Sequence, residues 1–417
     1  MPEFIDLLPP DIALTNFLEQ IPRQVESEVI EVKSALGRVA VNDVHAPHSL
    51  PAFHRSTVDG YAVIASDTHG ASDSQPVYLV QIEEIKMGES PDFTLLTTQC
   101  GLIHTGGMLP KGSDAVVMLE NTQVARPGEI EILRAVAEGE NVIKVGEDIA
   151  AGAVVVAGGT LLRAAEIGGL LALGITELQV ARRPRVGIIS SGDEIIPPES
   201  VPNPGQVRDI NSYSLSALVE QAGGVPQRYG IIPDDYEKLR GGLERAIDEN
   251  NMVVITAGSS ASSRDLTAQV INSLGGPGVI THGVNIRPGK PTILAGCQPA
   301  GVDWIKPVIG LPGNPVSALV IGILFVEPVI NFLHGQDYLR PRGRLEAKLA
   351  INLASKAGRE DWVPVKILPV ENGFSAEPIF GKSNLIFTLC RADGLLHIPP
   401  HSTGLNAGEI AEVMLLN

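Results

Sequence analysis

Hydrophobic and polar positions follow different periods along this chain, and the changes of period mark its parts. From about residue 185, apolar runs of strand length alternate with patterns in which every third or fourth residue is apolar. Strands are predicted at residues 186–190, 227–232, 253–256 and 308–311, and helices at residues 211–222, 235–249, 265–274 and 315–334. Such alternation is typical of a parallel sheet covered by helices. A three-layer α/β domain is therefore predicted over residues 181–335.

Apolar residues alternate with polar ones in two other regions, which predicts β structure there. Short strands are expected at residues 77–82, 101–104 and 115–119, with Gly and Pro between them. Strand-like alternation returns at residues 345–351, 363–367, 395–398 and 413–415. The sequence thus predicts a small β-rich module over residues 45–145. It also predicts a separate β domain over residues 336–417, built as a barrel or a sandwich.

The N-terminal part combines both patterns. Residues 14–21 have apolar positions at helical spacing, residues 29–32 form a strand pattern, and residues 164–173 form a second helical pattern. We expect the second helix to rejoin the first. The β-rich module would then be an insertion in a discontinuous α/β linker domain made of residues 1–44 and 146–180.

Composition narrows the class of protein. Of the 417 residues, 44% are hydrophobic and 19% are charged, which is typical of a folded soluble chain. The formal net charge is -17 and aromatic residues make up 4%, whereas nucleic-acid binding needs a basic face, and single strands need stacking platforms. We therefore expect no nucleic-acid partner. An anionic substrate is expected only where cations or backbone amides are concentrated.

The cysteines and the apolar runs indicate the cellular compartment in which the protein is expected. Cys100, Cys297 and Cys390 are isolated, so neither a disulfide framework nor a zinc site is predicted, and a reducing cytoplasm is expected. The N-terminus lacks the basic and apolar blocks of a secretory signal. The most apolar run, residues 316–326, is too short to cross a bilayer and is followed by Glu327. We expect a buried helix there and no membrane contact.

A turn over residues 310–317, Gly-Leu-Pro-Gly-Asn-Pro-Val-Ser, separates the last predicted strand of the α/β domain from its long helix. Pro312 and Gly313 suit a tight turn, Asn314 is a favoured helix cap, and Pro315 suits the first helical position. Free backbone amides should therefore collect at a positive helix end, where an anion can bind. An ordinary strand-to-helix turn is the alternative, and the neighbouring loops have to decide between the two.

Three loops leave the carboxyl ends of predicted strands, where ligands bind in sheets of this kind: residues 190–194, 256–265 and 311–315. Their Gly and Ser residues suit phosphate, and carboxylates such as Glu194 and Asp265 suit Mg²⁺, although an Asp at a helix start is more often a cap. The sequence contains neither Gly-x-Gly-x-x-Gly nor Gly-x-x-x-x-Gly-Lys-Ser/Thr. A nucleotide site outside the dinucleotide and P-loop classes is predicted.

Cations gather at Arg287-Pro-Gly-Lys290-Pro, which we predict to clamp an oxyanion, with a solvated basic turn as the alternative. Two loops of the β-rich module also carry candidate chemistry. Residues 51–63 contain ionisable side chains and the turn signal Asp59-Gly60, and residues 104–115 combine a hydroxyl, glycines and a lysine in a form that suits a phosphate. Hairpin corners and surface turns use the same residue types.

Several of these motifs together resemble the molybdopterin molybdenumtransferase family, the bacterial MoeA type shared with the E-domain of gephyrin. In family order they are residues 56–61, 103–117, 146–148, 191–194, 209–211, 288–291 and 311–317. The resemblance covers essentially the whole chain. It implies a molybdopterin-binding-type three-layer α/β domain, an inserted β-rich module and a C-terminal small β-barrel. It also implies a homodimer whose active site lies between the α/β domain of one subunit and the module of the other.

The resemblance further implies a reaction: adenylated molybdopterin is hydrolysed, AMP leaves, and molybdate is bound to the dithiolene with the help of Mg²⁺. Positions that match family residues important for activity are Asp59, Thr105, Asp148, Glu194, Asp234 and Asp265, of which Glu194 and Asp265 would hold Mg²⁺. Substrate and nucleotide contacts are expected from Ser191, Gly192, Asp209, Asn211, Gly258, Ser260, Pro312, Gly313 and Asn314. Molybdate contacts are expected from Arg287, Lys290, Pro291, Ser317, Arg359 and Ser383.

Two departures separate this chain from many members of the family. The loop over residues 257–265 keeps Gly258, Ser260 and Asp265 but loses two glycines, and Arg287 stands where others have lysine. Either drift or a subgroup that inserts tungstate explains such changes. A non-catalytic pterin-binding or scaffold protein of this fold is the main alternative. The adenylyltransferase that makes the substrate shares only the α/β domain, and contact with it and with recipient molybdoenzymes is expected.

Overall fold

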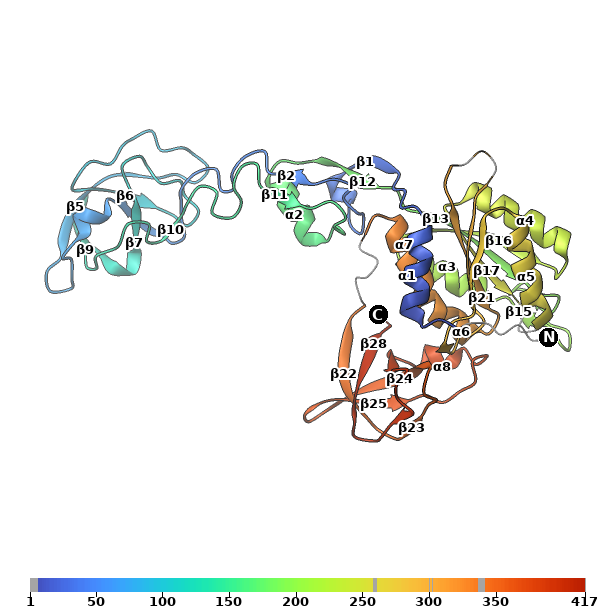
Figure 1. The fold of residues 1–417 in the computed structure, drawn as a ribbon. Coiled ribbons are helices and arrows are strands. Elements are labelled where there is room, and N and C mark those ends of the chain that lie inside the picture. The colour runs from blue at the N-terminus through green and yellow to red at the C-terminus, as the bar shows by residue number, and fades with distance from the viewer. Residues whose placement is uncertain (1–6, 258–260, 300, 302, 337–341, 417) are drawn as a thin grey trace.

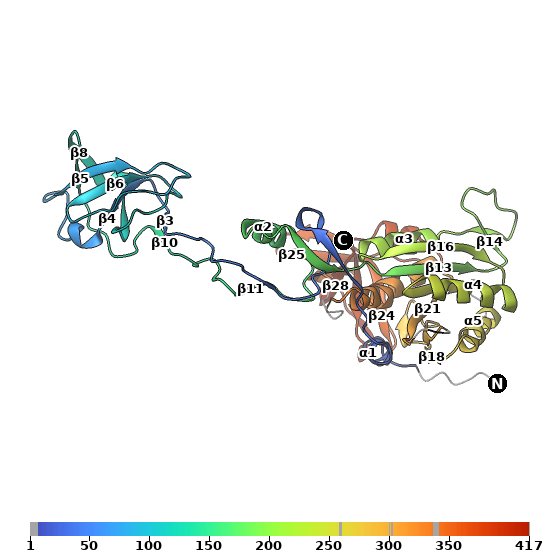
Figure 2. The ribbon, with the colours of Figure 1, turned by 90° about the horizontal axis from the view of Figure 1, so that it is seen from above.

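The computed structural model describes residues 7–257, 261–299, 301, 303–336 and 342–416. The molecule is elongated and has three parts (Figures 1 and 2): a body with the α/β domain and the C-terminal barrel, a thin arm, and a distal module at the far end of the arm. The chain leaves the body after α1, passes through the arm, folds the distal module and returns through the arm. The distal module is thus an insertion, as predicted.

A six-stranded sheet forms the centre of the body, in the order β16-β13-β17-β21-β20-β18. Its strands are β13 (Arg185–Ser191), β16 (Val225–Ile232), β17 (Met252–Ala257), β18 (Pro277–His282), β20 (Ile293–Cys297) and β21 (Lys306–Pro312). The four predicted strands pair in parallel, as predicted, whereas β20, which was not predicted, runs antiparallel to both of its neighbours. The pattern missed β18 and β20 because both are short and interrupted by glycine.

Two layers of helices cover this sheet. The helix α3 (Asn211–Gln221) and the long helix after β21 pack on one face, and α4 (Tyr236–Glu249) and α5 (Ala261–Ser273) pack on the other. Asp235 caps α4, because its carboxylate accepts a hydrogen bond of 3.0 Å from the Lys238 amide. The predicted three-layer α/β domain is therefore confirmed.

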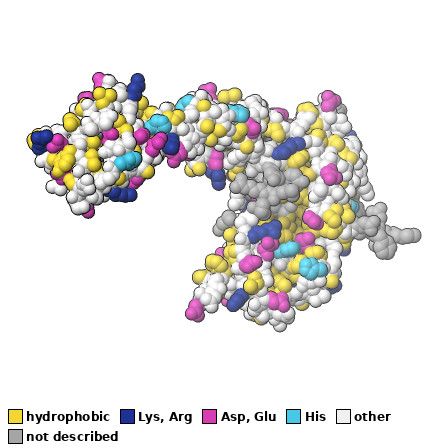
Figure 3. All heavy atoms as spheres, turned by 60° about the vertical axis from the view of Figure 1, so that its left-hand side comes forward, with side chains coloured by type: hydrophobic (Ala, Val, Ile, Leu, Met, Phe, Trp, Pro, Cys, Tyr) yellow, Lys and Arg dark blue, Asp and Glu magenta, His cyan; other side chains and the backbone are white. Residues whose placement is uncertain are grey.

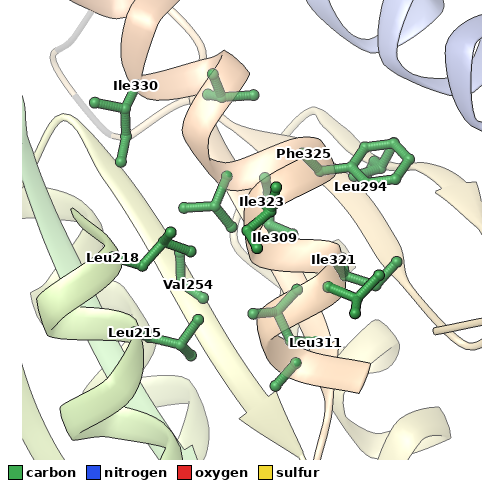
Figure 4. Packing of buried hydrophobic residues seen from close by; sticks show 14 of the residues in the cluster. Leu215, Leu218, Val254, Leu294, Ile309, Leu311, Ile321, Ile323, Phe325 and Ile330 are labelled. Atoms are coloured by element: carbon green, nitrogen blue, oxygen red, sulfur yellow. The ribbon is translucent and has the colours of Figure 1, made fainter. Parts of the chain in front are cut away.

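The long helix after β21 changes type twice along its length. It consists of α6 (Pro315–Ile321), a π-helical segment (Gly322–Val326) and α7 (Glu327–Leu333). The π-helical segment ends two residues before Pro328, whose ring and missing amide hydrogen disfavour a regular α-helix in the preceding turn. Figure 4 shows its apolar side chains packed among residues of α3 and the sheet, including Leu215, Leu218, Val254, Ile309 and Leu311.

This 19-residue helix is long and apolar enough to cross a membrane by length and composition. The expectation that the apolar run is too short was wrong, because the helix continues past Glu327 and Pro328. More than half of its most apolar window is nevertheless buried inside the body. Burial of this degree identifies it as the core helix of the α/β domain, which agrees with the predicted buried helix.

The arm consists of two antiparallel strand pairs and one helix. β1 (Ser27–Glu31) pairs with β12 (Glu177–Ala181), β2 (Val44–His45) pairs with β11 (Val154–Val156), and α2 (Ala164–Ala172) packs beside the short helix η1 (Val32–Ser34). The first helix, α1 (Pro10–Gln20), does not join α2. Its Phe17 and Leu18 are buried in the body core instead, and α1 contacts β18 and β20. The expected reunion of the two helices was therefore wrong.

The distal module contains a six-stranded sheet in the order β7-β4-β6-β5-β9-β8. Its strands are β4 (Gly60–Val63), β5 (Val77–Glu84), β6 (Gln99–Ile103), β7 (Ala115–Met118), β8 (Thr122–Arg126) and β9 (Glu129–Ile132), with short helices η2 (Ala65–Thr68) and η3 (Leu119–Asn121). β3 (Arg55–Ser56) and β10 (Val142–Ile143) pair where the module meets the arm. The three strands predicted in this module are present as β5, β6 and β7.

The C-terminal region is a small closed barrel (Figure 1). Five strands pair in a ring: β24 (Glu360–Val370), β25 (Gly373–Pro378), β22 (Arg344–Leu349), β28 (Ile410–Leu415) and β26 (Gly394–Ile398), which returns to β24. The remaining elements are β23 (Leu353–Ala354), β27 (Gly404–Leu405) and α8 (Phe387–Cys390). β19 (Ile286–Arg287), from the α/β part of the chain, pairs with the start of β24 and fastens the barrel to the body. The predicted barrel is confirmed, and the sandwich alternative is wrong.

Candidate active site

A cavity of about 860 Å³ lies between the α/β domain and the barrel. Residues 286–291 and the turn after β21 form one wall, and β24 together with the loop before α8 forms the other. All six residues predicted to hold molybdate line this cavity: Arg287, Lys290, Pro291, Ser317, Arg359 and Ser383. The fold thus brings together residues from two domains that are far apart in the sequence.

The turn between β21 and α6 contributes Pro312, Asn314 and Ser317 to the cavity wall. Asn314 occupies the N-cap position of α6, as predicted, but its side chain makes no capping hydrogen bond. Its Nδ2 donates a hydrogen bond of 3.0 Å to Ser383 Oγ in the barrel instead. The Val316 amide, expected to be free for an anion, donates to the Ser383 carbonyl oxygen at 3.0 Å. The prediction of a turn with free amides was therefore wrong at this position, because the barrel occupies it.

The segment that carries Arg287 and Lys290 is shaped by Gly289 between them. Gly289 has a φ of 113°, and a Cβ at this position would lie 2.3 Å from Cγ1 of the buried Ile321. Only glycine fits such a backbone so close to α6. The Gly289 carbonyl oxygen accepts a hydrogen bond of 2.7 Å from Thr292 Oγ1, which closes the turn. Both cations are exposed and project from a turn that is held against the core.

A buried carboxylate, Asp361, lies on the barrel wall of the cavity, and the sequence reasoning missed it. It accepts two hydrogen bonds from Arg359, from Nε to Oδ1 at 2.7 Å and from Nη2 to Oδ2 at 3.1 Å. Arg287 Nη1 lies 3.7 Å from the same Oδ2. No local pattern in the sequence singles out Asp361, because Arg359 precedes β24 and Arg287 reaches Asp361 only through the pairing of β19 with β24.

Lys382 is a further cation on this cavity. It is exposed and stands next to Ser383 on the barrel side. Trp362 also lines the cavity and stacks on His397, with ring centroids 4.5 Å apart. The lining of the cavity therefore combines four cations with apolar residues such as Trp362 and Val363.

A second group of predicted residues meets at the carboxyl end of β13. Ser191 Oγ donates a hydrogen bond of 2.7 Å to Asp234 Oδ1, and the Asp234 amide donates one of 3.3 Å to Asp193 Oδ1. The Gly192 amide donates to the Ile232 carbonyl oxygen at 3.3 Å. The loop then continues through Glu194 into the pair β14 (Ile195–Ile196) and β15 (Val207–Arg208). Ser191, Gly192 and Asp234 are thus brought together, as loops of one sheet edge.

Asp209 and Asn211 lie at the start of α3 and connect this group to the turn after β21. The buried Asp209 carboxylate accepts hydrogen bonds from Ser190 Oγ (3.0 Å), the Ser212 amide (3.1 Å) and Ser212 Oγ (2.6 Å), so its oxygens are engaged within the protein. Asn211 Nδ2 donates a hydrogen bond of 2.8 Å to the Gly313 carbonyl oxygen. Asn211 Oδ1 is buried without a hydrogen-bond partner among the described residues.

The predicted Mg²⁺ ligands come from two loops. Glu194 is exposed beside Asp193, and Asp234 lies across from them. Gly258, Ser260 and the side chain of Asp265 lie outside the described residues. Across the described part of the chain, no group of three His, Cys, Asp or Glu side chains is arranged to hold a metal. The carboxylate donors that are described are of the hard, oxygen type that Mg²⁺ prefers.

A third group lies in the distal module. Asp59 Oδ1 accepts a hydrogen bond of 2.8 Å from the Thr105 amide, and His104 Nδ1 lies 3.7 Å from the same oxygen. The other ring nitrogen of His104 lies 2.9 Å from Glu84 Oε1, and this hydrogen bond raises the pKa of His104 above its usual value. Asp148 is exposed near the arm, where its amide donates to the Leu50 carbonyl oxygen.

Asp59, Thr105 and Asp148 are not brought to the cavity within one chain. The distal module stands at the opposite end of the molecule from the body (Figures 1 and 2). On the face shown in Figure 3, Lys and Arg side chains are mixed with Asp and Glu over the distal module and the arm, without an extended basic patch among the coloured residues. Asp59 and Thr105 thus form a separate pair of exposed residues in the distal module, and Asp148 is exposed near the arm.

An α/β domain and a small barrel with a cationic cavity between them define a class of protein suited to binding an oxyanion at a domain boundary. Three family models match the chain: the MoeA N-terminal region (domain I and II) at residues 8–174, the "Probable molybdopterin binding domain" at residues 187–331, and the MoeA C-terminal region (domain IV) at residues 346–416. The chain therefore belongs to the MoeA family, as its motifs indicated.

Individual relatives agree with the family models. The molybdopterin molybdenumtransferase of Nostoc sp. is 36% identical over 405 residues, which cover 96% of this chain and 91% of that protein. Molybdopterin molybdenumtransferase 2 of Mycobacterium tuberculosis is 33% identical over 389 residues, which cover 92% of this chain and 94% of that protein. Two crystal structures of a molybdopterin biosynthesis MoeA protein from Pyrococcus horikoshii superpose with TM-scores of 0.79 and 0.85, at 36% and 32% identity. Each covers at least 98% of this chain and 100% of the other.

Proposed function

We propose that this chain is a molybdopterin molybdenumtransferase, a transferase of molybdenum cofactor biosynthesis. In this reaction molybdate is inserted into adenylated molybdopterin, and AMP is released. Membership of the MoeA family and the names of the curated relatives support the enzyme class. The observation that carries the proposal is the cavity between the α/β domain and the barrel, because it gathers the cations and hydroxyls that an oxyanion needs.

Molybdate is a tetrahedral dianion, and charge-assisted hydrogen bonds are the strongest that a protein can offer it. We assign Arg287 and Lys290 to this role on the α/β wall, and Arg359 on the barrel wall. Ser317 and Ser383 would supply hydroxyl donors, with Pro291 shaping the wall. Because these groups come from both walls, a bound oxyanion would also bridge the two domains.

The adenylated end of the substrate is assigned to the sheet edge next to the cavity. Ser191 and Gly192 end β13, and the turn Pro312, Gly313 and Asn314 ends β21. The hydrogen bond from Ser190 to Asp209 joins β13 to the start of α3, and that from Asn211 to Gly313 joins α3 to the turn after β21, which supports one continuous site. We also assign Asp209, Gly258 and Ser260 to the binding of the adenylated end. Asp209 would act indirectly, because its carboxylate accepts a hydrogen bond from the Ser212 amide and so stabilises the start of α3.

Magnesium is assigned to Glu194 and Asp265, with Asp234 close by. When bound, Mg²⁺ would neutralise the phosphate that a water molecule attacks. The Ser191 hydroxyl donates its one hydrogen to Asp234 at 2.7 Å, so we assign it to holding the Asp234 carboxylate at this sheet edge and not to donating to the phosphate.

The distal residues Asp59, Thr105 and Asp148 require a second subunit in this proposal. The distal module is held away from the body by the arm, so its loops would reach the site of a partner in a homodimer. We further propose a cytoplasmic location, and contacts with the adenylyltransferase and with recipient molybdoenzymes.

The test is release of AMP by the purified chain. Adenylated molybdopterin, MgCl₂ and sodium molybdate are supplied, and AMP is quantified by chromatography. We expect AMP release that Lys290→Met reduces strongly, whereas Lys348→Met, an exposed lysine on β22 outside the cavity, leaves it unchanged. A correctly folded preparation, shown by a cooperative thermal unfolding transition, that releases no AMP would support the scaffold alternative. Adenylation of molybdopterin from ATP would support the adenylyltransferase, and faster turnover with tungstate would support a tungstate-inserting enzyme.

A further inference from the structure

Asp361 is the one acidic residue among the described residues that line the cavity between the α/β domain and the barrel. Its side chain is only 4% exposed. Four cations line the same cavity: Arg287, Lys290, Arg359 and Lys382. A carboxylate here lowers the positive potential that an oxyanion would meet. Asp361 therefore does not serve to attract the oxyanion, and its contacts indicate a different role.

The contacts of Asp361 reach both walls of the cavity. On the barrel side, Arg359 grips it with two hydrogen bonds of 2.7 Å and 3.1 Å, the fork geometry of an arginine and a carboxylate. On the α/β side, Arg287 Nη1 lies 3.7 Å from Oδ2. The parallel pairing of β19 with β24 sets Arg287 directly opposite Asp361, so the strand register produces this contact.

The hydrogen bonds of Arg359 leave part of its guanidinium free. A guanidinium has five N–H donors in one plane, and Asp361 accepts from two of them. The remaining donors lie in a plane that the fork has fixed. An arginine side chain that is mobile in the free protein loses rotamer entropy when it binds a ligand. A side chain already fixed by a protein contact loses less, so its affinity for the ligand is higher.

We propose that Asp361 is a positioning residue for the oxyanion cavity. It fixes the guanidinium plane of Arg359 and holds Arg287 near it, so that free N–H groups from both walls meet one oxyanion. This inference rests on the proposed function of the cavity as an oxyanion site. It adds to that function a residue that does not itself contact the oxyanion.

The direction in which Asp361→Asn changes molybdate affinity distinguishes a positioning role from a purely electrostatic effect. Asp361→Asn removes a negative charge from a cationic cavity, so electrostatics alone predicts tighter binding of molybdate. Positioning predicts weaker binding, because an amide cannot hold two guanidinium groups with the same strength. We expect isothermal titration of the full chain with sodium molybdate to give a dissociation constant raised about 10-fold or more for Asp361→Asn. Unchanged or tighter binding overturns the proposal.

A second variant keeps the charge and moves the carboxylate. Asp361→Glu lengthens the side chain by one methylene, so the fork with Arg359 is displaced while the charge stays. We expect weakened molybdate binding here too, and binding equal to that of the unmodified chain overturns the proposal. Thermal unfolding of both variants is the structural control. If neither variant folds, Asp361 is a structural residue and the proposal fails.

The same titrations distinguish failure of this inference from failure of the proposed function. Lys290→Met tests whether the cavity binds molybdate at all, and Lys348→Met is the matched control outside it. If the unmodified chain does not bind molybdate, or Lys290→Met binds it equally well, the proposed function fails and the inference falls with it. If Lys290→Met binds weakly while both Asp361 variants bind normally, only the inference fails.

Discussion

The side-chain amide of Asn314 donates a hydrogen bond of 3.0 Å to the hydroxyl of Ser383, and this contact joins the α/β domain to the barrel. The amide of Val316, the second residue of α6, donates to the Ser383 carbonyl oxygen. Ser383 of the barrel therefore accepts hydrogen bonds from both the Asn314 side chain and the Val316 amide. The wall of the cavity exists in this form only while the two domains stay docked.

Ser383→Ala should weaken molybdate binding by about 5-fold, in line with the roughly 1 kcal/mol of one hydrogen bond. The substitution removes the hydroxyl that Asn314 contacts but keeps the backbone contact with Val316. Titration with molybdate measures the effect. Ser375→Ala, on β25 of the same barrel but outside the cavity, is the control and should bind as the unmodified chain does. Equal binding by Ser383→Ala would remove Ser383 from the site.

Gly289→Ala should destabilise the body by about 2 kcal/mol or more and weaken molybdate binding. The new Cβ would lie 2.3 Å from Ile321 Cγ1, at a φ that disfavours any side chain. Relief of this contact would displace Lys290, the next residue. Thermal unfolding and molybdate titration measure the two effects. A variant with an unchanged melting temperature would contradict the role given to Gly289.

Gly241→Ala provides the matched control for this glycine. Gly241 lies inside α4, and a Cβ there meets nothing within 4 Å. Alanine stabilises helix interiors relative to glycine by about 0.5–1 kcal/mol, so the melting temperature should rise slightly. Molybdate binding should be unaffected. The two substitutions add the same methyl group and differ only in where it lies.

The imidazole of His104 should titrate above the usual range, because Glu84 holds its protonated form through the hydrogen bond of 2.9 Å. Stability from this pair is present at low pH and is lost as the pH rises through the raised pKa. Glu84→Gln should lower the pKa of His104. An NMR pH titration of protein with isotope-labelled histidine measures the pKa of His104, with the His69 signal as internal reference. An identical midpoint in both proteins would show that Glu84 does not control His104.

His334 should make the body sensitive to acid. It is fully buried at the end of α7, and burial lowers its pKa from 6.5 to about 4. The unfolded chain binds this proton below pH 6.5 and the folded chain does not, so stability falls as the pH drops from 6.5 to about 4. This difference corresponds to about 3 kcal/mol.

The acid sensitivity is measured by thermal unfolding between pH 7 and pH 4. His334→Phe keeps a ring of similar size but cannot be protonated, so its melting temperature should fall less over this range. His401→Gln, an exposed histidine in the barrel, should follow the unmodified chain. A His334→Phe variant with the same pH profile as the unmodified chain would contradict this source of acid sensitivity.

Elements with long apolar periodicity were predictable from the sequence. The strands β13, β17 and β21 are continuous apolar runs of strand length, and the helices α3 and α4 repeat apolar residues every third or fourth position. α1 was predicted as a helix but assigned to the wrong partner. Its apolar face is visible in the sequence, whereas the surface that it covers is set by tertiary packing.

Parts of the candidate site depend on contacts that no local pattern reports. Asp361 lies in an alternating strand, and its meeting with Arg287 results from the pairing of β19 with β24. Asn314 has the residue type of a helix cap, but a barrel residue far along the chain competes for its side chain. The six cavity residues could be grouped in advance only through the family resemblance, because their distances in sequence contain no periodicity.

The pairing of β2 with β11 sets His45 opposite Val154. The chain enters the outer half of the arm at His45 and leaves it at Val154. The Cα atoms of directly opposed residues in an antiparallel pair are about 5 Å apart, so these two points are neighbours. A turn of about two residues, such as Asn-Gly, is enough to close such a gap. One short splice would thus remove the distal module without opening the body, so that the oxyanion cavity and the distal carboxylates become separable halves of one enzyme.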